Sequence, residues 1–326
     1  MGGKLVNKPK IFITRHIPKK YLIPYKDDFE FSQWEKEDVP VPRETLLAEI
    51  REVDGILSML SDRMDEELLN HAKQLKIISN LAVGFDNIDV DTMQERNVVV
   101  TNTPDVLTET TADLTFTLLL ATARRVIEAN DLIRDNEWKH WSPFLLAGAD
   151  VYGQTIGIVG MGRIGQAVAR RAMGFNMNIL YHNRSRDLAV EKTIGATYSS
   201  FDNLIKTADY IVSLVPLTAE TEGLFDKSVF EKMKNSAIFI NVSRGQVVDE
   251  DALYKALKSK TIQAAGLDVF QKEPISNDHP LMQLSNAVCL PHIGSASVRT
   301  REKMIELCLK NLHGYFYGEG PITPVK

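Results

Sequence analysis

The feature that most constrains this chain is a glycine-rich turn set between a short apolar run and a helical pattern. The run Thr155-Ile-Gly-Ile-Val has the character of a buried strand, and it leads directly into Gly160-Met-Gly-Arg-Ile-Gly165. The helical pattern Gln166-Ala-Val-Ala-Arg-Arg-Ala follows at once. In this strand–turn–helix context a GxGxxG sequence predicts a site for the pyrophosphate of a dinucleotide, whereas alone it would be a weak signal.

The residues of this turn have separate predicted roles. Gly160 makes the tight turn, Gly162 lets the backbone approach the pyrophosphate, and Gly165 lets the helix and the strand pack closely. The free N–H groups at the start of the helix, with Arg163 and Ile164 beside them, then favour the phosphates. They do so because a helix N-terminus carries partial positive charge.

Short β-rich runs alternate with helical patterns along the whole chain. Such alternation predicts an α/β fold built on parallel, doubly wound sheets with helices on both faces. The expected strands span residues 10–15, 54–60, 75–83, 98–103, 155–160, 178–183, 208–216, 236–243, 264–270 and 287–291. Helical stretches between them include residues 43–53, 65–74 and 249–259.

The glycine turn begins almost halfway along the chain, which indicates two domains. We expect a Rossmann-type nucleotide-binding domain over residues 104–298 and a smaller, flavodoxin-like domain that binds the substrate. The smaller domain is discontinuous in this prediction, because it comprises residues 1–103 and 299–326. One long helix over residues 111 to about 136 is expected to link the domains, and a last helix over residues 299 to about 317 is expected to cross back.

The composition excludes several classes of partner. The chain has 326 residues and a net charge of −5, without the basic excess expected of a protein that binds nucleic acid or an anionic membrane. Met1 to Lys10 is polar and basic and lacks the apolar core of a secretion signal. Cys289 and Cys308 form neither a disulfide framework nor a metal-ligand spacing, which favours a reduced, cytoplasmic setting and no metal site.

The end of the second strand after the glycine turn indicates which dinucleotide is bound. Sites that prefer NAD place an acidic residue there, about 20 residues past the glycines, to bind the ribose hydroxyls. This chain has Asn183, Arg184, Ser185 and Arg186 instead. A carboxylate would repel a 2′-phosphate, whereas two guanidinium groups and a hydroxyl would bind it through charge-assisted hydrogen bonds. NADP(H) is therefore the predicted cofactor, with NAD(H) possible; the alternative is a solvated basic loop tempered by Asp187.

Polar residues that follow three consecutive expected strands form the candidate catalytic set. Arg244 and His292 follow two of these strands, Asp268 ends the apolar run Ala264-Ala-Gly-Leu of the third, and Glu273 lies five residues beyond Asp268. Ligands of open α/β sheets bind beyond the carboxyl ends of the strands, so these residues belong to the edge that holds the glycine turn. Each residue alone is more often structural. Their convergence beside a cofactor turn favours catalysis.

These residue types suit the transfer of a hydride to C2 of a 2-oxo acid. The hydride leaves negative charge on the carbonyl oxygen, so a proton donor must lie beside it, and histidine side chains titrate near neutrality. His292 is the candidate donor. Glu273 behind its ring would favour the imidazolium and fix its orientation. Arg244 can bind the substrate carboxylate and polarise the carbonyl group through a forked contact.

With these residues the chain resembles the D-isomer-specific 2-hydroxyacid dehydrogenase family over almost its whole length. The family-like motifs are Gly160–Gly165, Asn241–Gly245, Ala265–Phe270, Lys272–Pro274 and Leu290–Ser295. The resemblance implies that Arg244, Glu273 and His292 form a catalytic triad with His292 as the acid/base. It also implies a substrate bound between two domains and a homodimer paired through the nucleotide-binding domain.

Within the family the chain resembles the glyoxylate/hydroxypyruvate reductases, through Asn80–Asp89, Thr108–Asp113 and Trp138–Pro143. The resemblance implies that the backbone of Val83 and Gly84 holds the substrate carboxylate. It further implies substrate contacts by Leu60 and Ser295, and cofactor contacts by Val215, Pro216, Thr221, Val242, Asp268 and Gly294. Trp141 would reach toward the partner's active site, although it could equally be ordinary interface core.

The predicted function is therefore NADPH-dependent reduction of a small 2-oxo acid, glyoxylate or hydroxypyruvate, to the D-2-hydroxy acid. A nearby alternative is a 2-ketogluconate reductase, which would take larger sugar acids. An alternative of another class is a nucleotide-sensing binding protein, like the transcriptional corepressors that share this fold. That alternative predicts tight cofactor binding with negligible turnover, and no basic arm or added interaction segment supports it.

Overall fold

The computed structural model of the protein describes residues 8–325, and residues 1–7 and 326 lie outside the described part. We expected no secretion signal in residues 1–10, and residues 1–7 of this stretch lie outside the described part. The chain divides into two compact units, one from Met1–Leu107 and Ser297–Lys326 and the other from Thr108–Ala296. Among residues 8–325, no helix is both long and apolar enough to cross a membrane.

The larger unit contains a sheet of seven parallel strands in the order β12-β11-β10-β9-β6-β7-β8. The strands are β6 (Thr155–Val159), β7 (Asn178–His182), β8 (Thr197–Tyr198), β9 (Tyr210–Ser213), β10 (Ile238–Asn241), β11 (Ala264–Leu267) and β12 (Ala287–Cys289). This is the Rossmann order 3-2-1-4-5-6 with one further strand at the edge. Because every pair is parallel, the carboxyl ends of all the strands lie along one edge.

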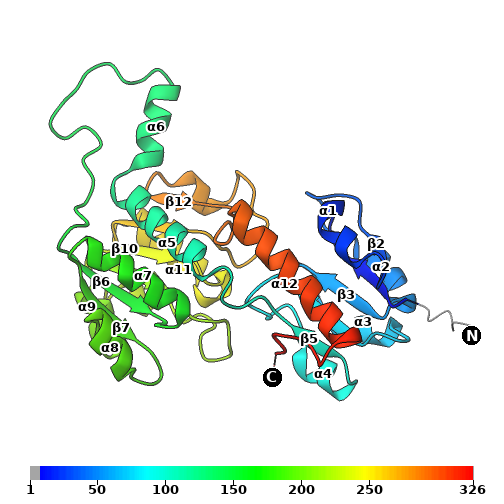
Figure 1. Ribbon diagram of the computed structural model, residues 1–326. Helices are drawn as coiled ribbons and strands as arrows, with labels where there is room; N and C mark the ends of the chain where they lie inside the picture. Colours follow the sequence, from blue (N-terminus) through cyan, green and yellow to red (C-terminus); the bar gives the residue numbers. More distant parts are fainter. Residues whose placement is uncertain (1–7, 326) are drawn as a thin grey trace, which may run out of the picture. The chain divides into compact units, whose positions relative to one another are not determined.

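Helices cover both faces of this sheet (Figure 1). They are α5 (Thr108–Ala123), α6 (Val126–Arg134), α7 (Arg163–Gly174), α8 (Leu188–Ile194), α9 (Phe201–Thr207), α10 (Lys227–Phe230) and α11 (Glu250–Lys258), with 3-10 turns η3 (Gly245–Val247) and η4 (Pro280–Gln283). Successive strand residues point to opposite faces, so Ile158 joins the apolar cluster beneath α5 and α7. Its neighbour Val159 joins the cluster beneath α9, α10 and α11. The strands are therefore mainly apolar, as is typical of parallel strands buried on both faces.

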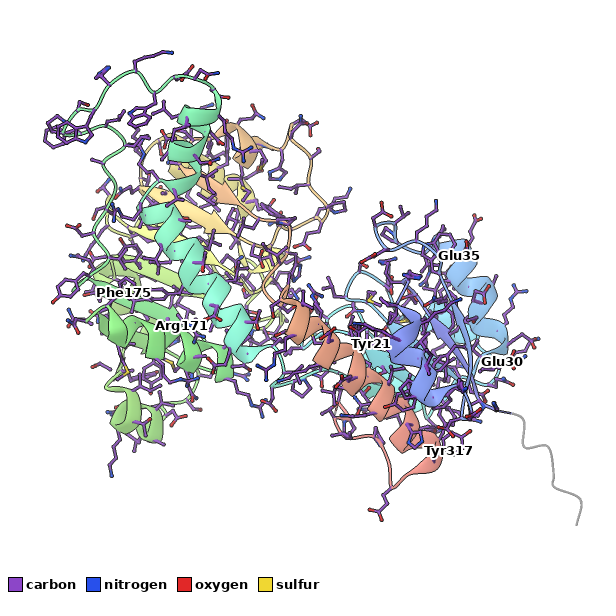
Figure 2. The ribbon with its side chains drawn as sticks, turned by 45° about the horizontal axis from the view of Figure 1, so that its top comes forward. Tyr21, Glu30, Glu35, Arg171, Phe175 and Tyr317 are labelled. Atoms are coloured by element: carbon purple, nitrogen blue, oxygen red, sulfur yellow. The ribbon has the colours of Figure 1, made fainter. Side chains whose placement is uncertain are left out.

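α5 and α7 pack against each other, and two residues of this contact are labelled in Figure 2. Arg171 Nη2 donates to Asp113 Oδ1 over 2.6 Å. Phe175, the residue directly after α7, has its ring centroid 4.9 Å from that of Phe116. This contact ties the helix that opens the unit to the helix that follows the glycine turn.

The smaller unit contains five parallel strands in the order β2-β1-β3-β4-β5, the flavodoxin-like order 2-1-3-4-5. The strands are β1 (Lys10–Ile13), β2 (Glu30–Gln33), β3 (Gly55–Ser58), β4 (Ile77–Asn80) and β5 (Val99–Thr101). The helices are α1 (Lys19–Leu22), α2 (Arg43–Glu49), α3 (Glu66–His71), α4 (Val90–Glu95) and α12 (Val298–Tyr317), with 3-10 turns η1 (Ile23–Tyr25) and η2 (Ile50–Glu52). The predicted fold class, a Rossmann-type sheet plus a smaller flavodoxin-like sheet, is confirmed.

The last helix, α12, belongs to the smaller unit, where it packs on β3 and β4. Ser79 Oγ, from the middle of β4, donates to the carbonyl oxygen of Cys308 over 3.2 Å. Burial raises the pKa of the Cys308 thiol to about 12, so this cysteine is a packing residue rather than a reactive one.

The structure corrects the prediction of one continuous helix over residues 111–136. The segment forms α5 and α6 with a break at Arg125, which takes the left-handed conformation with φ +54°. The carbonyl oxygen of Ala123 accepts from the N–H of Ala149 over 2.8 Å. In a continuous helix this carbonyl group would instead accept from the N–H four residues further along. Neither glycine nor proline marks this break in the sequence. The structure also contains two edge strands, β2 and β8, that the β-rich runs did not predict, because these strands are short or half exposed.

Candidate active site

The glycine turn has the geometry that a dinucleotide requires. Gly160 has φ +105°, and a Cβ there would lie 2.7 Å from the carbonyl oxygen of Leu214. A Cβ on Gly165 would lie 2.2 Å from the carbonyl oxygen of Gly160. A Cβ on Gly162 would meet no atom within 4 Å, so open space lies directly over this residue. The first and third glycines are thus required by packing, whereas the second leaves room for a ligand.

Gly162 also begins helix α7, which runs for 12 residues without any side-chain cap at its N-terminus. The first N–H groups of a helix have no intrahelical acceptor, and together with the helix dipole they favour an anion. The open space over Gly162 and the uncapped N–H groups fit a pyrophosphate at this point. Arg163 and Ile164 are the first residues of the helix after Gly162.

The residues that we predicted to determine the cofactor preference lie directly after β7. Asn183 Oδ1 accepts from Met161 N over 2.7 Å, which ties this strand end to the glycine turn. Arg184 is exposed and lies 3.6 Å from a carboxylate oxygen of Glu220. Arg186 makes a forked pair with Glu191, with both N···O distances 2.7 Å.

Asp187, the one carboxylate of this run, caps α8 by accepting from the N–H groups of Ala189 and Val190 over 3.1 Å. Its charge is therefore engaged by a helix N-terminus. Ser185, between the two arginines, lies in the exposed part of the same loop.

His292 and Glu273 meet beyond the carboxyl ends of β12 and β11. His292 Nδ1 lies 2.8 Å from Glu273 Oε2, and Glu273 Oε1 accepts from the N–H of Phe270 over 2.9 Å. His292 has a left-handed backbone with φ +53°, which its N–H supports by donating to the carbonyl oxygen of Asp268 over 2.9 Å. This conformation is uncommon for a residue other than glycine. With Nδ1 held by the carboxylate, Nε2 is the nitrogen left to serve a substrate.

The surroundings of Glu273 favour its ionised, carboxylate form. Burial works to raise the pKa of the Glu273 carboxyl, but the hydrogen bond and charge of His292 oppose it, and the pKa lies below its usual value. The N–H of Phe270 and the charge of Arg244 act in the same direction as His292. The charge of the Arg244 guanidinium is thus close enough to lower the pKa of the Glu273 carboxyl.

Asp268 lies beneath the His292 loop and is fully buried. Its two carboxylate oxygens accept from the N–H groups of Ile293 and Gly294, each over 2.8 Å. Burial raises the pKa of the Asp268 carboxyl to about 6, although both N–H groups and the nearby His292 charge lower it. The carboxylate therefore holds the backbone just after His292, and its predicted contact with a cofactor remains a prediction.

Arg244 is held by two buried polar residues that the sequence analysis did not single out. Asn241 Nδ2 donates to the carbonyl oxygen of Arg244 over 2.9 Å, and its Oδ1 accepts from Ser243 Oγ over 2.8 Å. Arg244 Nη1 donates to the carbonyl oxygen of Ser243 over 2.8 Å. A Cβ on Gly245 would lie 1.8 Å from the carbonyl carbon of Phe270, so the loops after β10 and β11 touch here. In the sequence, the signal for Asn241 and Ser243 is their position as polar residues at the end of an apolar strand.

The other predicted cofactor residues follow β9 and β12 in the same unit. Val215, Pro216 and Thr221 lie in the loop after β9, where Thr221 Oγ1 donates to the carbonyl oxygen of Pro216 over 2.6 Å. Val242 is buried and packs near Gly294. Ser295 follows Gly294 on the His292 loop.

Three predicted substrate residues belong to the smaller unit. Leu60 follows β3, and Val83 and Gly84 follow β4, so all three lie at the carboxyl edge of that sheet. Trp141 belongs to the segment after α6 and is 77% exposed. The roles of these four residues stay predictions.

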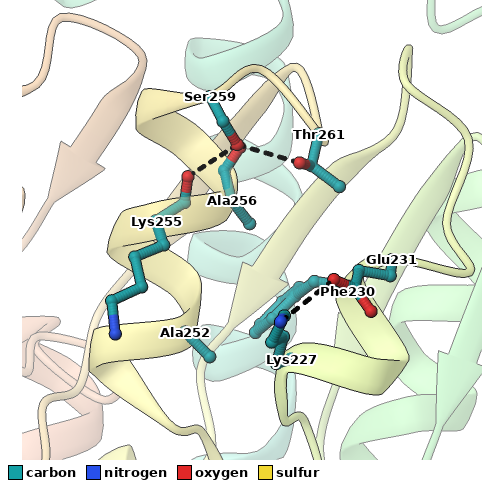
Figure 3. Close-up of a pocket in the computed structure, with 8 residues that line it drawn as sticks. All are labelled: Lys227, Phe230, Glu231, Ala252, Lys255, Ala256, Ser259 and Thr261. Carbon is teal, nitrogen blue, oxygen red and sulfur yellow. Dashed lines mark hydrogen bonds and ion pairs between the residues drawn. The ribbon is translucent and has the colours of Figure 1, made fainter.

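A hollow between α10 and α11 is a separate feature (Figure 3). It has a volume of about 110 Å³, and none of the candidate site residues lines it. Its lining is Lys227, Phe230, Glu231, Ala252, Lys255, Ala256, Ser259 and Thr261. Among residues 8–325 there is also no group of three or more His, Cys, Asp or Glu side chains that could hold a metal ion.

Comparison with known proteins agrees with this geometry. A family model described as "D-isomer specific 2-hydroxyacid dehydrogenase, NAD binding domain" matches residues 116–294. The chain is 50% identical over 324 residues to a glyoxylate reductase of Pyrococcus horikoshii, which covers 98% of this chain and 96% of that protein.

Solved structures are similar over nearly the whole chain. A Thermus thermophilus protein aligns with a TM-score of 0.91 at 42% identity and covers 97% of this chain and 100% of its own. An NADPH-dependent glyoxylate/hydroxypyruvate reductase of Sinorhizobium meliloti, solved with NADP and malonate, aligns with a TM-score of 0.86 at 35% identity. That alignment covers 98% of this chain and 97% of the other.

The glycine turn yields a prediction that separates packing from binding. Gly162→Ala places a methyl group in open space, so the protein should keep its stability while its affinity for NADPH falls by about tenfold or more. Gly165→Ala forces a clash with backbone, so it should destabilise the fold by about 1–3 kcal/mol. Thermal unfolding and fluorescence titration with NADPH measure the two effects. Equal loss of stability in both variants would contradict the assignment.

Proposed function

The chain belongs to the D-isomer-specific 2-hydroxyacid dehydrogenase family, and from this premise we propose that it reduces glyoxylate and hydroxypyruvate with NADPH. Reduction of a small 2-oxo acid with a nicotinamide cofactor is the activity of the family. The choice of glyoxylate rests on relatives named glyoxylate reductase at about half identity. The observation that carries the chemistry is the 2.8 Å contact between His292 Nδ1 and Glu273 Oε2 at the edge that holds the glycine turn.

The residues of the turn fit the cofactor, because space over Gly162 and the uncapped start of α7 provide a cradle for a pyrophosphate. When bound, the reduced nicotinamide supplies the hydride. His292 then donates the proton from Nε2 to the oxygen on C2, so that hydride and proton together convert the carbonyl to a hydroxyl group. Glu273 keeps Nδ1 protonated and the ring oriented throughout. Arg244 stabilises the negative charge that develops on the substrate oxygen.

A rate assay with a matched pair of variants tests this function. Wild type should oxidise NADPH on addition of glyoxylate or hydroxypyruvate, followed at 340 nm. His292→Ala should lower kcat by roughly 10²–10⁴-fold, because it removes the proton donor. His313→Ala is the control, since His313 also faces a carboxylate, Asp28 at 3.5 Å, in the other unit. Tight NADPH binding with no turnover in wild type would favour the nucleotide-sensing binding protein instead.

The depressed pKa of Glu273 leads to a pH prediction with a definite sign. A carboxyl whose pKa is lowered stays ionised to lower pH, so activity that needs the Glu273 carboxylate should persist below the usual titration range of a glutamate. Glu273→Gln removes the ionisable group, so it should lower kcat/KM for reduction at every pH and abolish the acid fall that Glu273 causes. Glu250→Gln, next to His279 at 3.5 Å, should leave the profile in place. A Glu273→Gln variant with the kcat/KM and the pH profile of wild type would contradict the role of Glu273.

The proposed preference for NADPH rests on the end of β7. Asn183 takes the place of the carboxylate, and the next two residues, Arg184 and Ser185, are exposed, with Arg184 3.6 Å from Glu220. Arg186 is already paired in a fork with Glu191, so Arg184 carries the larger part in this proposal. A charge-assisted hydrogen bond contributes about 1.5–3 kcal/mol, which corresponds to a difference of about 10–100-fold.

Arg184→Gln should therefore raise KM for NADPH by about tenfold or more. KM for NADH should change by less than about twofold, because NADH lacks the phosphate that the guanidinium binds. The same KM comparison on Arg186→Gln should show a smaller effect, since that side chain is held by Glu191. Equal changes for the two cofactors would contradict a phosphate contact.

We propose further that two copies pair through the larger unit. α6 has no buried residue and projects from the rest of that unit (Figure 1). Large exposed apolar side chains gather on α6 and the segment after it: Val126, Ile127, Ile133, Trp138, Trp141, Phe144 and Leu145. Clusters of exposed large apolar side chains commonly mark surfaces that bind another protein. Sedimentation equilibrium should give about twice the 36.6 kDa of one chain, and Phe144→Asp should shift the mass toward one chain. A monomeric wild type would refute the pairing.

A further inference from the structure

The loop after β4 is fixed by donors that lie just beyond β5. The N–H of Thr103 donates to the carbonyl oxygen of Ala82 over 2.8 Å. The side-chain amide of Asn102 donates through Nδ2 to the carbonyl oxygen of Val83 over 2.7 Å. Asn102 is itself anchored, because its carbonyl oxygen accepts from Thr323 Oγ1 over 2.7 Å. Two successive carbonyl groups of the loop thus have fixed directions.

Asn80, the last residue of β4, fixes the third carbonyl group in succession. It is fully buried, and its Nδ2 donates to the carbonyl oxygen of Gly84 over 3.1 Å. Its Oδ1 accepts from Ser58 Oγ over 3.1 Å, which defines the orientation of the amide. Nδ2 also lies 3.3 Å from Oδ1 of Asn87, and Asn87 Nδ2 donates to the carbonyl oxygen of Met59 over 3.2 Å. The loops after β3 and β4 are therefore joined through side-chain amides.

These contacts determine where the N–H groups of the loop point. A peptide unit is planar and trans, so the N–H of each residue points opposite to the preceding carbonyl group. Holding the carbonyl groups of Ala82 and Val83 therefore directs the N–H groups of Val83 and Gly84 away from β5. Among residues 8–325, neither N–H group has a protein acceptor. Two unpaired donors at the carboxyl edge of a parallel sheet form a cradle suited to an anion.

We propose that Asn102 and Asn80 are positioning residues for the oxo acid: Asn102 holds the Val83 carbonyl and so directs the Gly84 N–H toward the substrate carboxylate, and Asn80 holds the Gly84 carbonyl and so fixes the same residue from its other side. This inference rests on the proposed function. The N–H groups contact the substrate, and the two amides act only through them. Donors that are already oriented bind an anion without the cost of ordering the loop, so loss of either amide weakens binding rather than chemistry.

Asn102→Ala tests this role through a split between binding and rate. The dianion oxalate, which carries a carboxylate but cannot be reduced by hydride, is the probe of binding in the presence of NADPH. The variant should raise the oxalate Kd and KM for glyoxylate by about tenfold, since one peptide unit is freed to rotate. kcat and the Kd of NADPH should change by less than about twofold, because the proton donor and the glycine turn lie in the other unit.

Asn286→Ala is the matched control. Asn286 Nδ2 donates to the carbonyl oxygens of Leu257 and Gln263 over 3.2 and 2.9 Å, so the same kind of bond is lost next to the amino end of β12. That variant should bind oxalate as wild type does. Asn102→Asp keeps the size of the side chain but sets a carboxylate against the Val83 carbonyl, so it should weaken oxalate binding at least as much as the alanine variant.

The outcomes separate this inference from the proposed function. Wild type that binds oxalate but does not reduce glyoxylate would end the proposed substrate, while the Asn102 titration would still decide the positioning role. An unchanged oxalate Kd in folded Asn102→Ala or Asn102→Asp would overturn the positioning role alone. Wild type that binds no oxalate would overturn both.

Discussion

The parallel alignment of every strand is the constraint on which the candidate site depends. In the larger sheet it brings the ends of β6, β7, β10, β11 and β12 to one edge, where the glycine turn and the polar residues follow. An antiparallel strand would send its carboxyl end to the opposite edge and remove its residue from the site. The site can therefore be built from short motifs that are far apart in the sequence, because the parallel sheet brings the strand ends that carry them to one edge.

Within that edge, fixed hydrogen bonds orient the reactive groups before any ligand arrives. Glu273 holds one ring nitrogen of His292, and Asp268 holds the backbone that follows it. Asn241 holds the backbone of Arg244 in the same manner. Asp268 and Asn241 are short polar side chains at the ends of apolar strands, where burial strengthens their hydrogen bonds, and Glu273 lies in the loop after β11. The smaller unit uses the same device, with Asn80 and Asn102 in place of carboxylates.

Much of this architecture could be predicted, because its signals are local in sequence. The strand–turn–helix pattern at Gly160 and the apolar runs were enough for the fold class, since strands buried on both faces are continuously apolar. The break at Arg125 could not be predicted, because it depends on a hydrogen bond between Ala123 and Ala149, which lies 26 residues beyond Ala123 in the chain. The pairing of Arg186 with Glu191 was equally hidden, since both residues are charged, exposed and compatible with a solvated loop. Tertiary partners, not local propensity, decide such features.

The central claim is that His292 delivers a proton to the oxygen on C2 of a small 2-oxo acid while a hydride reaches the carbon. Its most direct test is the product formed from hydroxypyruvate and NADPH, measured by chiral chromatography together with the NADPH consumed. The account predicts D-glycerate alone, with one molecule formed for each NADPH oxidised. L-glycerate, or NADPH oxidation without glycerate, would contradict it.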